Sequence, residues 1–217
     1  AEASIPIREG GRCEHGILLE RTGGIDALPV PDEHPGPDSR EAYSLKITAD
    51  SVTASARSSA GLFYAVQTLK QLVEGTEAQG VLPVVEIKDW PALAYRGVMV
   101  DMSHGALPTE KEVERQLDFL AHWKNNQYYF YSEASIELTG FPLINPEGRF
   151  SKDEVRRIIA YGRERHIDVV PCLELFGHLH DLFRVEKYSD LSDLPHGVEF
   201  DPSNPKVMTL LTNWVSQ

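Results

Sequence analysis

The fold is decided by residues 81–105, VLPVVEIKDWPALAYRGVMVDMSHG, where one sequence pattern gives way to another at Pro91. Before Pro91, short segments of alternating apolar and polar residues predict strands, and residues 81–90 form the last of them. After Pro91, apolar strands alternate with long amphipathic helices, which is typical of βα units with a parallel sheet. The sequence therefore predicts two domains, residues 1–90 and residues 91–217.

The first predicted domain is a small α+β unit. Residues 17–22 read as a strand, and the period-two alternation across residues 43–56 predicts a β-hairpin. In residues 59–73 the apolar side chains recur every three or four positions, which indicates one face of a helix. Gly75 is suited to end that helix. With the strand at residues 81–90, these elements form one accessory domain.

The second predicted domain contains three successive βα units. Its strands are expected at residues 95–102, 127–132 and 167–175. Its helices are marked at their starts by two capping boxes, Thr109 with Glu112 and Ser151 with Glu154, and by Pro205 in a first turn. A closed (β/α)8 barrel of the TIM type needs about 250 residues, so three units do not close one. We expect a fragment of a longer enzyme, with an open α/β layer as the alternative.

Composition excludes some classes of partner. The formal charge of −12 disfavours binding to nucleic acid or to an anionic membrane surface, because both repel a negative protein. No apolar run reaches the roughly 18 residues of a membrane span, and the first residues, AEASIPIREGGR, lack the apolar core of a signal peptide. We expect a soluble chain, and the initial Ala1 is compatible with an export signal already removed. Cys13 and Cys172 form neither a disulfide framework nor a metal-type pair.

Polar residues gather where the predicted strands end. They are Asp101 and His104 at the end of the first strand, Glu133 and Glu137 at the end of the second, and Glu174, His178 and His180 at the end of the third. Parallel strands bring their carboxyl ends together, and active sites of α/β proteins form there. A single His or Glu at a strand end is more often structural or solvated. Three such groups at one end favour a functional site.

Arg96 stands near the start of an otherwise apolar strand. An unpaired buried guanidinium would cost several kcal/mol, so this side chain must be paired or reach a ligand. Both an internal ion pair with Asp101 or Glu174 and a role in ligand binding remain open at this point.

Two stretches, residues 56–75 (ARSSAGLFYAVQTLKQLVEG) and residues 81–105, resemble the junction between the accessory domain and the barrel in family 20 glycoside hydrolases, the β-N-acetylhexosaminidases. PCLELFGH at residues 171–178 resembles the family's PE-x-D-x-PGH strand end. YFYSEASIELTGFP at residues 129–142 resembles the second strand of a divergent branch, since the HWHLxDD motif of the better-known branch is absent.

The resemblance implies roles for the candidate residues. Arg96 matches the arginine that holds the hydroxyls of the terminal sugar, a task that suits the fixed fork of guanidinium donors. Glu174 and His178 match an acid–histidine pair that supports the catalytic acid, while Cys172 stands where the family has Glu. The further substrate-binding candidates are Asp101, Glu133 and Glu137.

The resemblance also implies an exo-acting enzyme that removes terminal N-acetyl-hexosamine from a glycan with retention, without cofactor or metal. The substrate's acetamido oxygen attacks the anomeric carbon, an aspartate orients that amide, and a glutamate protonates the leaving oxygen. In the family this Asp–Glu pair follows the fourth strand, beyond Gln217. Asp32–Glu33 in a proline-rich loop and Asp153–Glu154 in a first helical turn do not replace it. We expect these 217 residues alone to be inactive.

Two other readings stay open. A metal-dependent barrel enzyme could use Glu174, His178, His180 and His104 as ligands, although His178 and His180 would point apart if their strand continued. A non-catalytic carbohydrate-binding module could have kept the fold and lost the acid pair.

Overall fold

The computed structural model describes residues 16–25, 28, 30, 32–75 and 81–217. The chain divides into two compact units, Ala1–Ala94 and Tyr95–Gln217, each described here by itself. Cys13 and the N-terminal stretch that the sequence analysis considered lie outside the described residues. Within the described residues, no helix combines the length and apolar character needed to cross a membrane.

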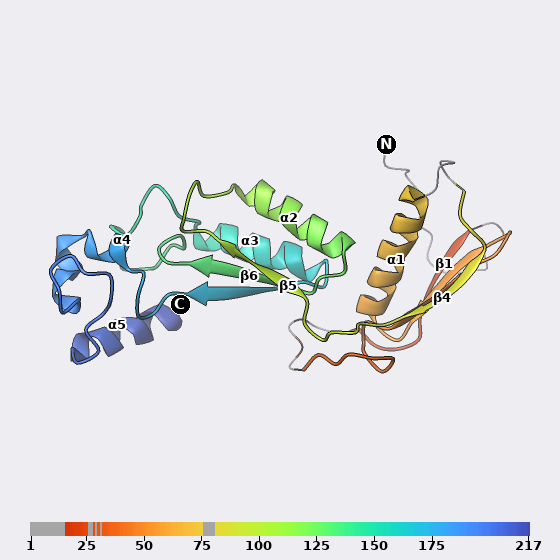
Figure 1. Ribbon diagram of the computed structural model, residues 1–217, viewed down its shortest axis with the longest axis horizontal. Helices are drawn as coiled ribbons and strands as arrows, with labels where there is room; N and C mark the ends of the chain where they lie inside the picture. Colours follow the sequence, from red (N-terminus) through yellow and green to blue (C-terminus); the bar gives the residue numbers. More distant parts are fainter. Residues whose placement is uncertain (1–15, 26–27, 29, 31, 76–80) are drawn as a thin grey trace. The chain divides into compact units, whose positions relative to one another are not determined.

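The first unit is a four-stranded sheet with one helix across it, and its strand order is β1-β3-β2-β4 (Figure 1). Its elements are β1 (Ile17–Arg21), β2 (Tyr43–Ile47), β3 (Val52–Ala56), α1 (Ser59–Glu74) and β4 (Val85–Asp89). The hairpin predicted from residues 43–56 is confirmed, because β2 and β3 pair antiparallel. β1 pairs parallel with β3, and β4 pairs antiparallel with β2.

The core of this unit follows the predicted periodicities. Alternate residues of β2 and β3 are buried and pack against one face of α1, namely Tyr43, Leu45, Ile47, Val52, Ala54, Ala56, Ala60, Tyr64, Ala65 and Leu69. The Ser58 side chain caps α1 by accepting from the Gly61 N–H, and Gly75 is the C-cap residue. Helix and sheet approach closely at Gly61, where a Cβ atom would lie 2.5 Å from the Ala42 carbonyl oxygen.

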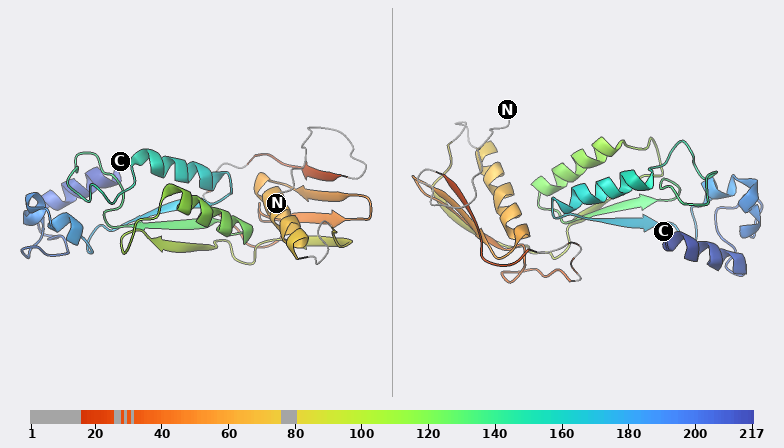
Figure 2. Two further views of the ribbon diagram at one scale, coloured as in Figure 1. Left: turned by 90° about the horizontal axis from the view of Figure 1, so that it is seen from above. Right: turned by 180° about the vertical axis from the view of Figure 1, so that it is seen from behind.

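The second unit is built on a parallel three-stranded sheet in the order β5-β6-β7. Its elements are β5 (Gly97–Asp101), α2 (Glu110–His122), β6 (Gln127–Ser132), α3 (Lys152–Arg163), β7 (Asp168–Leu173), α4 (His180–Phe183), the 3-10 helix η1 (Glu186–Leu191) and α5 (Pro205–Val215). The predicted alternation of strands and helices is confirmed. Helices α2 and α3 cover the same face of the sheet (Figures 1 and 2).

The helices α2 and α3 pack closely on this sheet. Tyr128 and Phe130 of β6 are buried on the helix side, and the Tyr128 hydroxyl donates to Oε1 of Gln116 in α2 at 2.7 Å. A Cβ atom at Gly162 would lie 2.8 Å from Val169 Cγ2, so α3 packs directly on β7 at this glycine. The result is an α/β layer in which the carboxyl ends of all three strands lie at the same edge of the sheet.

Of the two predicted capping boxes, one is complete. At the start of α3, the Ser151 side chain accepts from the Glu154 N–H, and the Glu154 carboxylate accepts from the Ser151 N–H. Thr109 caps α2 by accepting from the Glu112 N–H, but the Glu112 carboxylate binds the Arg115 guanidinium, with a shortest distance of 2.7 Å. The predicted reciprocal half at Thr109 is therefore wrong, because Arg115, one turn along, offers the carboxylate a charged partner.

After β7 the chain builds a second apolar cluster that the sequence analysis did not predict. It combines α4, η1, α5 and the segment after β6 around Ala134, Ile144, Leu179, Leu182, Phe183, Tyr188, Leu191, Phe200, Val207 and Trp214. The predicted helix beginning at Pro205 is confirmed as α5, capped by Asn204. It packs in this cluster, beyond the carboxyl ends of the strands (Figure 1).

Candidate functional site

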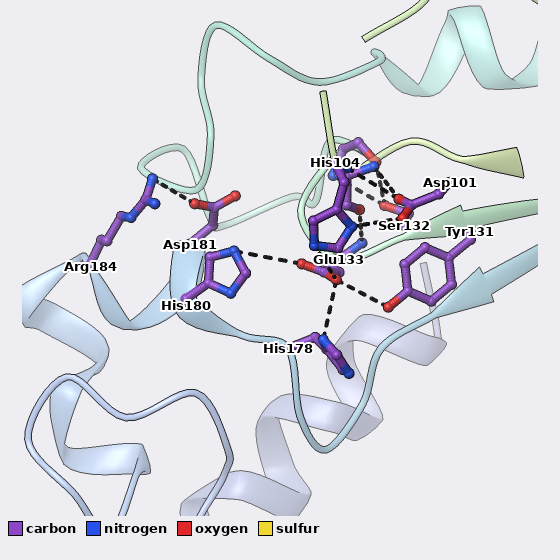
Figure 3. Close-up of polar contacts among 11 residues, drawn as sticks. Asp101, His104, Tyr131, Ser132, Glu133, His178, His180, Asp181 and Arg184 are labelled. Atoms are coloured by element: carbon purple, nitrogen blue, oxygen red, sulfur yellow. Dashed lines mark hydrogen bonds and ion pairs between the residues drawn. The ribbon is translucent and has the colours of Figure 1, made fainter. Parts of the chain in front are cut away.

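The carboxylate of Glu133, directly after β6, is the centre of the polar side chains at the carboxyl end of the sheet (Figure 3). Its side chain is only 2% exposed. The Tyr131 hydroxyl donates to its Oε1 at 3.1 Å, and its backbone N–H donates to the Ser103 hydroxyl at 2.8 Å. These contacts fix a buried carboxylate between the ends of β5 and β6.

Three histidines surround this carboxylate. His178 Nδ1 lies 3.6 Å and His104 Nε2 lies 3.8 Å from Glu133 Oε1, and His180 Nε2 lies 3.8 Å from Oε2. We refer to Asp101, His104, Tyr131, Glu133, His178 and His180 as the Glu133 cluster. At these distances a protonated imidazole forms an ion pair with the carboxylate.

His178 and His180 would point apart if their strand continued, but the strand does not continue. β7 ends at Leu173, and His178 adopts a left-handed backbone conformation with φ 56°. His180 then begins α4. The turn brings both imidazoles to Glu133. A positive φ is uncommon outside glycine, and no pattern of residue types in the sequence marks it.

Asp101 and His104 form a second couple within the cluster. His104 Nδ1 lies 2.7 Å from Asp101 Oδ2, while Asp101 Oδ1 accepts the N–H groups of Ser103 at 2.7 Å and His104 at 3.2 Å. The hydrogen bond and charge of Asp101, followed by the charge of Glu133, raise the pKa of His104. Desolvation of Asp101 is outweighed by hydrogen bonds from Ser103 and His104, which lower its pKa.

The Tyr131 hydroxyl stays protonated over the ordinary pH range. Burial raises its pKa, and the hydrogen bond to Glu133 and the negative charges of Glu133 and Glu174 raise it further. A protonated phenol can donate steadily to Glu133. Tyr131 was not among the predicted site residues. Its position on the same strand face as Asp101, its register partner, was the available signal.

A pocket of about 490 Å³ opens beside the cluster, within the roughly 300–1,000 Å³ typical of small-molecule sites. It is lined by Glu174, Phe176, Gly177, His178, His180, Val198 and Glu199. Two backbone hydrogen bonds, from Phe200 to Phe176 and from Leu179 to Val198, each 2.9 Å, hold its two walls together. Glu174 and His178, predicted as a pair, thus line one pocket.

Arg96 and Glu137 do not join the Glu133 cluster. Arg96 precedes β5, and its Nε donates to the Lys124 carbonyl at 2.8 Å, at the end of the sheet where strands begin. Asp101 is the last residue of β5, so Arg96 lies at the opposite end of that strand. The Glu137 carboxylate accepts the Lys152 N–H at 3.4 Å, at the start of α3.

The proposed metal ligands do not form a metal centre. Among the residues that the structure describes, no group of three or more His, Cys, Asp or Glu side chains could hold a metal ion. The three histidines of the cluster turn a ring nitrogen toward the Glu133 carboxylate. Cys172 lies on β7 as a free thiol whose pKa burial raises.

Residues 14–90 match the model for glycosyl hydrolase family 20, domain 2, and residues 93–209 match the model for the family 20 catalytic domain. The chain belongs to glycosyl hydrolase family 20. The resemblance that the sequence motifs suggested is therefore confirmed. The family 20 catalytic-domain match includes every residue of the Glu133 cluster.

Several curated proteins are similar to the chain. A β-hexosaminidase of Porphyromonas gingivalis is 30% identical over 204 residues, which cover 82% of this chain and 25% of that protein. The N,N'-diacetylchitobiase of Vibrio harveyi is 28% identical over 170 residues, covering 63% of this chain and 19% of that protein. The chain spans about a quarter of the length of the first of these curated relatives.

Solved structures share its fold. A mutant β-hexosaminidase of Streptomyces plicatus in complex with its product GlcNAc has a TM-score of 0.77 at 26% identity, covering 96% of this chain and 45% of that one. A chitobiase of Flavobacterium johnsoniae has a TM-score of 0.73 at 27% identity, covering 93% and 32% respectively.

Proposed function

We propose that residues 1–217 form part of an exo-acting β-N-acetylhexosaminidase, which removes terminal N-acetyl-hexosamine from a glycan by a retaining, substrate-assisted mechanism. In this proposal residues 1–90 are the accessory domain, and residues 91–217 supply the first three βα units of a (β/α)8 barrel. The observation that carries it is the convergence of Glu133, His178 and Glu174 at the carboxyl end of a sheet that matches the family 20 catalytic domain.

The side chains of this chain would support a proton transfer made by an acid elsewhere in the barrel. His178 turns Nδ1 toward Glu133, at 3.6 Å, which leaves Nε2 on the far side of the ring for the catalytic acid or the substrate. A carboxylate beside an imidazole fixes the orientation of the ring. Glu174, in the wall of the same pocket, offers an acceptor for sugar hydroxyls or for His178.

No metal or cofactor is needed for this reaction. The acetamido oxygen of the substrate attacks the anomeric carbon, and the bond to the leaving oxygen breaks as that oxygen takes a proton. Glu133, which is buried, would act through His178, whereas Asp101 would act through His104. We further propose that Arg96 binds sugar hydroxyls and that Glu137 lies near the sugar. Each of these two roles is tested separately.

The test uses the full-length protein, meaning the polypeptide that contains residues 1–217 and the rest of the barrel. We expect it to hydrolyse nitrophenyl N-acetyl-β-glucosaminide and to release the β-anomer first, as followed by NMR. Replacing the acetyl group by mono-, di- and trifluoroacetyl should slow the reaction progressively, because each fluorine weakens the attacking amide oxygen. A rate that does not depend on this substitution would refute substrate assistance.

Variants of the full-length protein separate the proposed roles. Glu133→Gln and His178→Gln should each lower kcat by about 10- to 100-fold, the usual effect of removing a partner that orients a reacting group. Arg96→Ala should raise KM if the guanidinium binds hydroxyls, and unchanged KM and kcat would remove it from the site. Glu137→Gln should alter KM only if that carboxylate reaches the sugar.

One observation keeps a carbohydrate-binding module as the second candidate. The adjacent acidic pairs in the described residues are used structurally: Glu33 binds Arg40, with Nε 2.9 Å from Oε1, while Glu154 completes its capping box with Ser151. If no Asp–Glu pair follows about 40–60 residues after Gln217, the spacing of one further barrel unit, the module is favoured. Binding of N-acetylglucosamine without hydrolysis would then be the expected result.

A further inference from the structure

We propose, on the basis of the function proposed above, that His104 and Asp101 are positioning residues: held by Asp101, the His104 imidazolium supplies the counter-charge that fixes Glu133, so that His178 keeps Nε2 for the reaction. Four observations lead to this division of roles.

The first is that Glu133 needs positive charge from nearby. Its side chain is 2% exposed, and an ionised carboxylate is costly to bury without a charged partner. Within the described residues, no lysine or arginine nitrogen lies within 4.0 Å of its oxygens, and the ion-pair partners are the three imidazoles at 3.6–3.8 Å. The Tyr131 hydroxyl donates a hydrogen bond but adds no charge.

The second is that His104 differs from the other two histidines in how its ring is used. Its Nδ1 lies 2.7 Å from Asp101 Oδ2 and its Nε2 lies 3.8 Å from Glu133 Oε1, so the ring bridges two carboxylates. The contact with Asp101 is a hydrogen bond and the contact with Glu133 is an ion-pair distance, and the positively charged imidazolium suits both. Its raised pKa agrees with this geometry. His178 and His180 each turn one ring nitrogen to Glu133.

The third is that the backbone joins the same groups. Asp101 Oδ1 accepts the N–H groups of Ser103 and His104, which shapes the turn after β5. The hydroxyl of Ser103 then accepts the N–H of Glu133 at 2.8 Å. The turn after β5 therefore holds Glu133 at its backbone through Ser103. It also holds the Glu133 carboxylate through His104 (Figure 3).

The fourth is that three acids act on His104, while the neighbouring titratable bases, His178 and His180, share Glu133 with it. Asp101 and Glu133 lie within 4.0 Å, and Asp181 at the start of α4 adds to the field that raises its pKa. Because that pKa is raised, the counter-charge on Glu133 is complete below the ordinary histidine pKa. It is lost as the pH rises through the pKa of folded His104.

The first experiment tests the coupling without any need for activity. The His104 ring resonance is followed against pH by NMR in the full-length protein, in Asp101→Asn, in Glu133→Gln and in Glu147→Gln, a control at an exposed residue. We expect the titration midpoint of His104 to fall in Asp101→Asn and in Glu133→Gln and to stay unchanged in the control. A midpoint that ignores Glu133→Gln would overturn the inference.

The second experiment tests the consequence for catalysis. In His104→Gln and Asp101→Asn of the full-length protein we expect kcat to fall about tenfold with little change in KM, because substrate contacts are intact. In His104→Gln, the part of the alkaline fall of kcat that comes from His104 should disappear from the pH profile. Asp101→Glu, which keeps a carboxylate, should retain part of the rate that Asp101→Asn loses. Native kcat and a native pH profile in both variants would overturn the positioning role. A full-length protein with no activity refutes the proposed function, and the His104 titration still decides the coupling.

Discussion

Truncating Phe200 should destabilise the apolar cluster behind the candidate pocket. Its side chain is 2% exposed, and its ring packs edge-on against Phe183 and Trp214, with centroids 5.6 and 6.0 Å apart. Deleting a buried Phe side chain to Ala costs about 3–5 kcal/mol, which includes about 0.5–1.5 kcal/mol for each aromatic pair. Because the Phe200 N–H also binds the Phe176 carbonyl, the loss should loosen a pocket wall.

The measurement is urea unfolding of the 217-residue chain followed by tryptophan fluorescence, with the free energy taken from the midpoint and slope. Phe200→Leu should cost about 1–2 kcal/mol, since it keeps most of the buried apolar volume. Leu194→Ala is the control, because Leu194 is 65% exposed and such changes usually stay within about 0.5 kcal/mol. If Phe200→Ala costs less than about 1 kcal/mol with an unchanged slope, the cluster does not stabilise the fold as inferred.

Four further changes should have measurable effects. Ser151→Ala should lower the unfolding free energy by about 1 kcal/mol, because it removes the capping box of α3, and urea titration checks this. Gly61→Val should prevent packing of α1 on its sheet, since a Cβ would lie 2.5 Å from a carbonyl oxygen, and circular dichroism should show lost structure. Asp101→Asn should make the unfolding free energy depend less on pH in the acid range. The lowered pKa of Asp101 stabilises the native protein above the pKa that this residue has in the unfolded chain, and this stabilisation is lost as the pH falls through the pKa of the folded protein. Met99→Lys should reduce binding of a hydrophobic dye, because Met99 lies on the open face of the sheet. Met208→Lys is the control: Met208 is 64% exposed and Met99 63%, and the control should change dye binding less.

Much of the fold could be predicted because its patterns are local. The alternation in residues 43–56 fixed the hairpin, and Ser151 with Glu154 marked the start of α3. The four-residue helix α4 and the 3-10 helix η1 were not predicted, because segments of that length show no helical period.

The candidate site could be predicted in part for a related reason. Parallel strands bring their ends together, so placing Asp101, Glu133 and His178 near one another required only the strand order. Which of them touch depended on loops: the left-handed backbone of His178 decides that its ring meets Glu133. Glu137, four residues after Glu133, turns instead to the start of α3.

The two faces of the β5-β6-β7 sheet differ in a way that bears on the proposed barrel. On the helix side, Tyr128 and Phe130 are buried at 0% and 2% exposure, whereas Met99 on the opposite face is 63% exposed. Parallel sheets are stable when both faces are covered, so an apolar side chain left open on one face indicates where further structure packs. Met99 pairs in register with Tyr129, and Asp101, two residues on, leads to the Glu133 cluster. A barrel that closed over this face would enclose the row that runs from Met99 to Asp101, and the cluster would then stand at its mouth, where barrel enzymes carry out their chemistry.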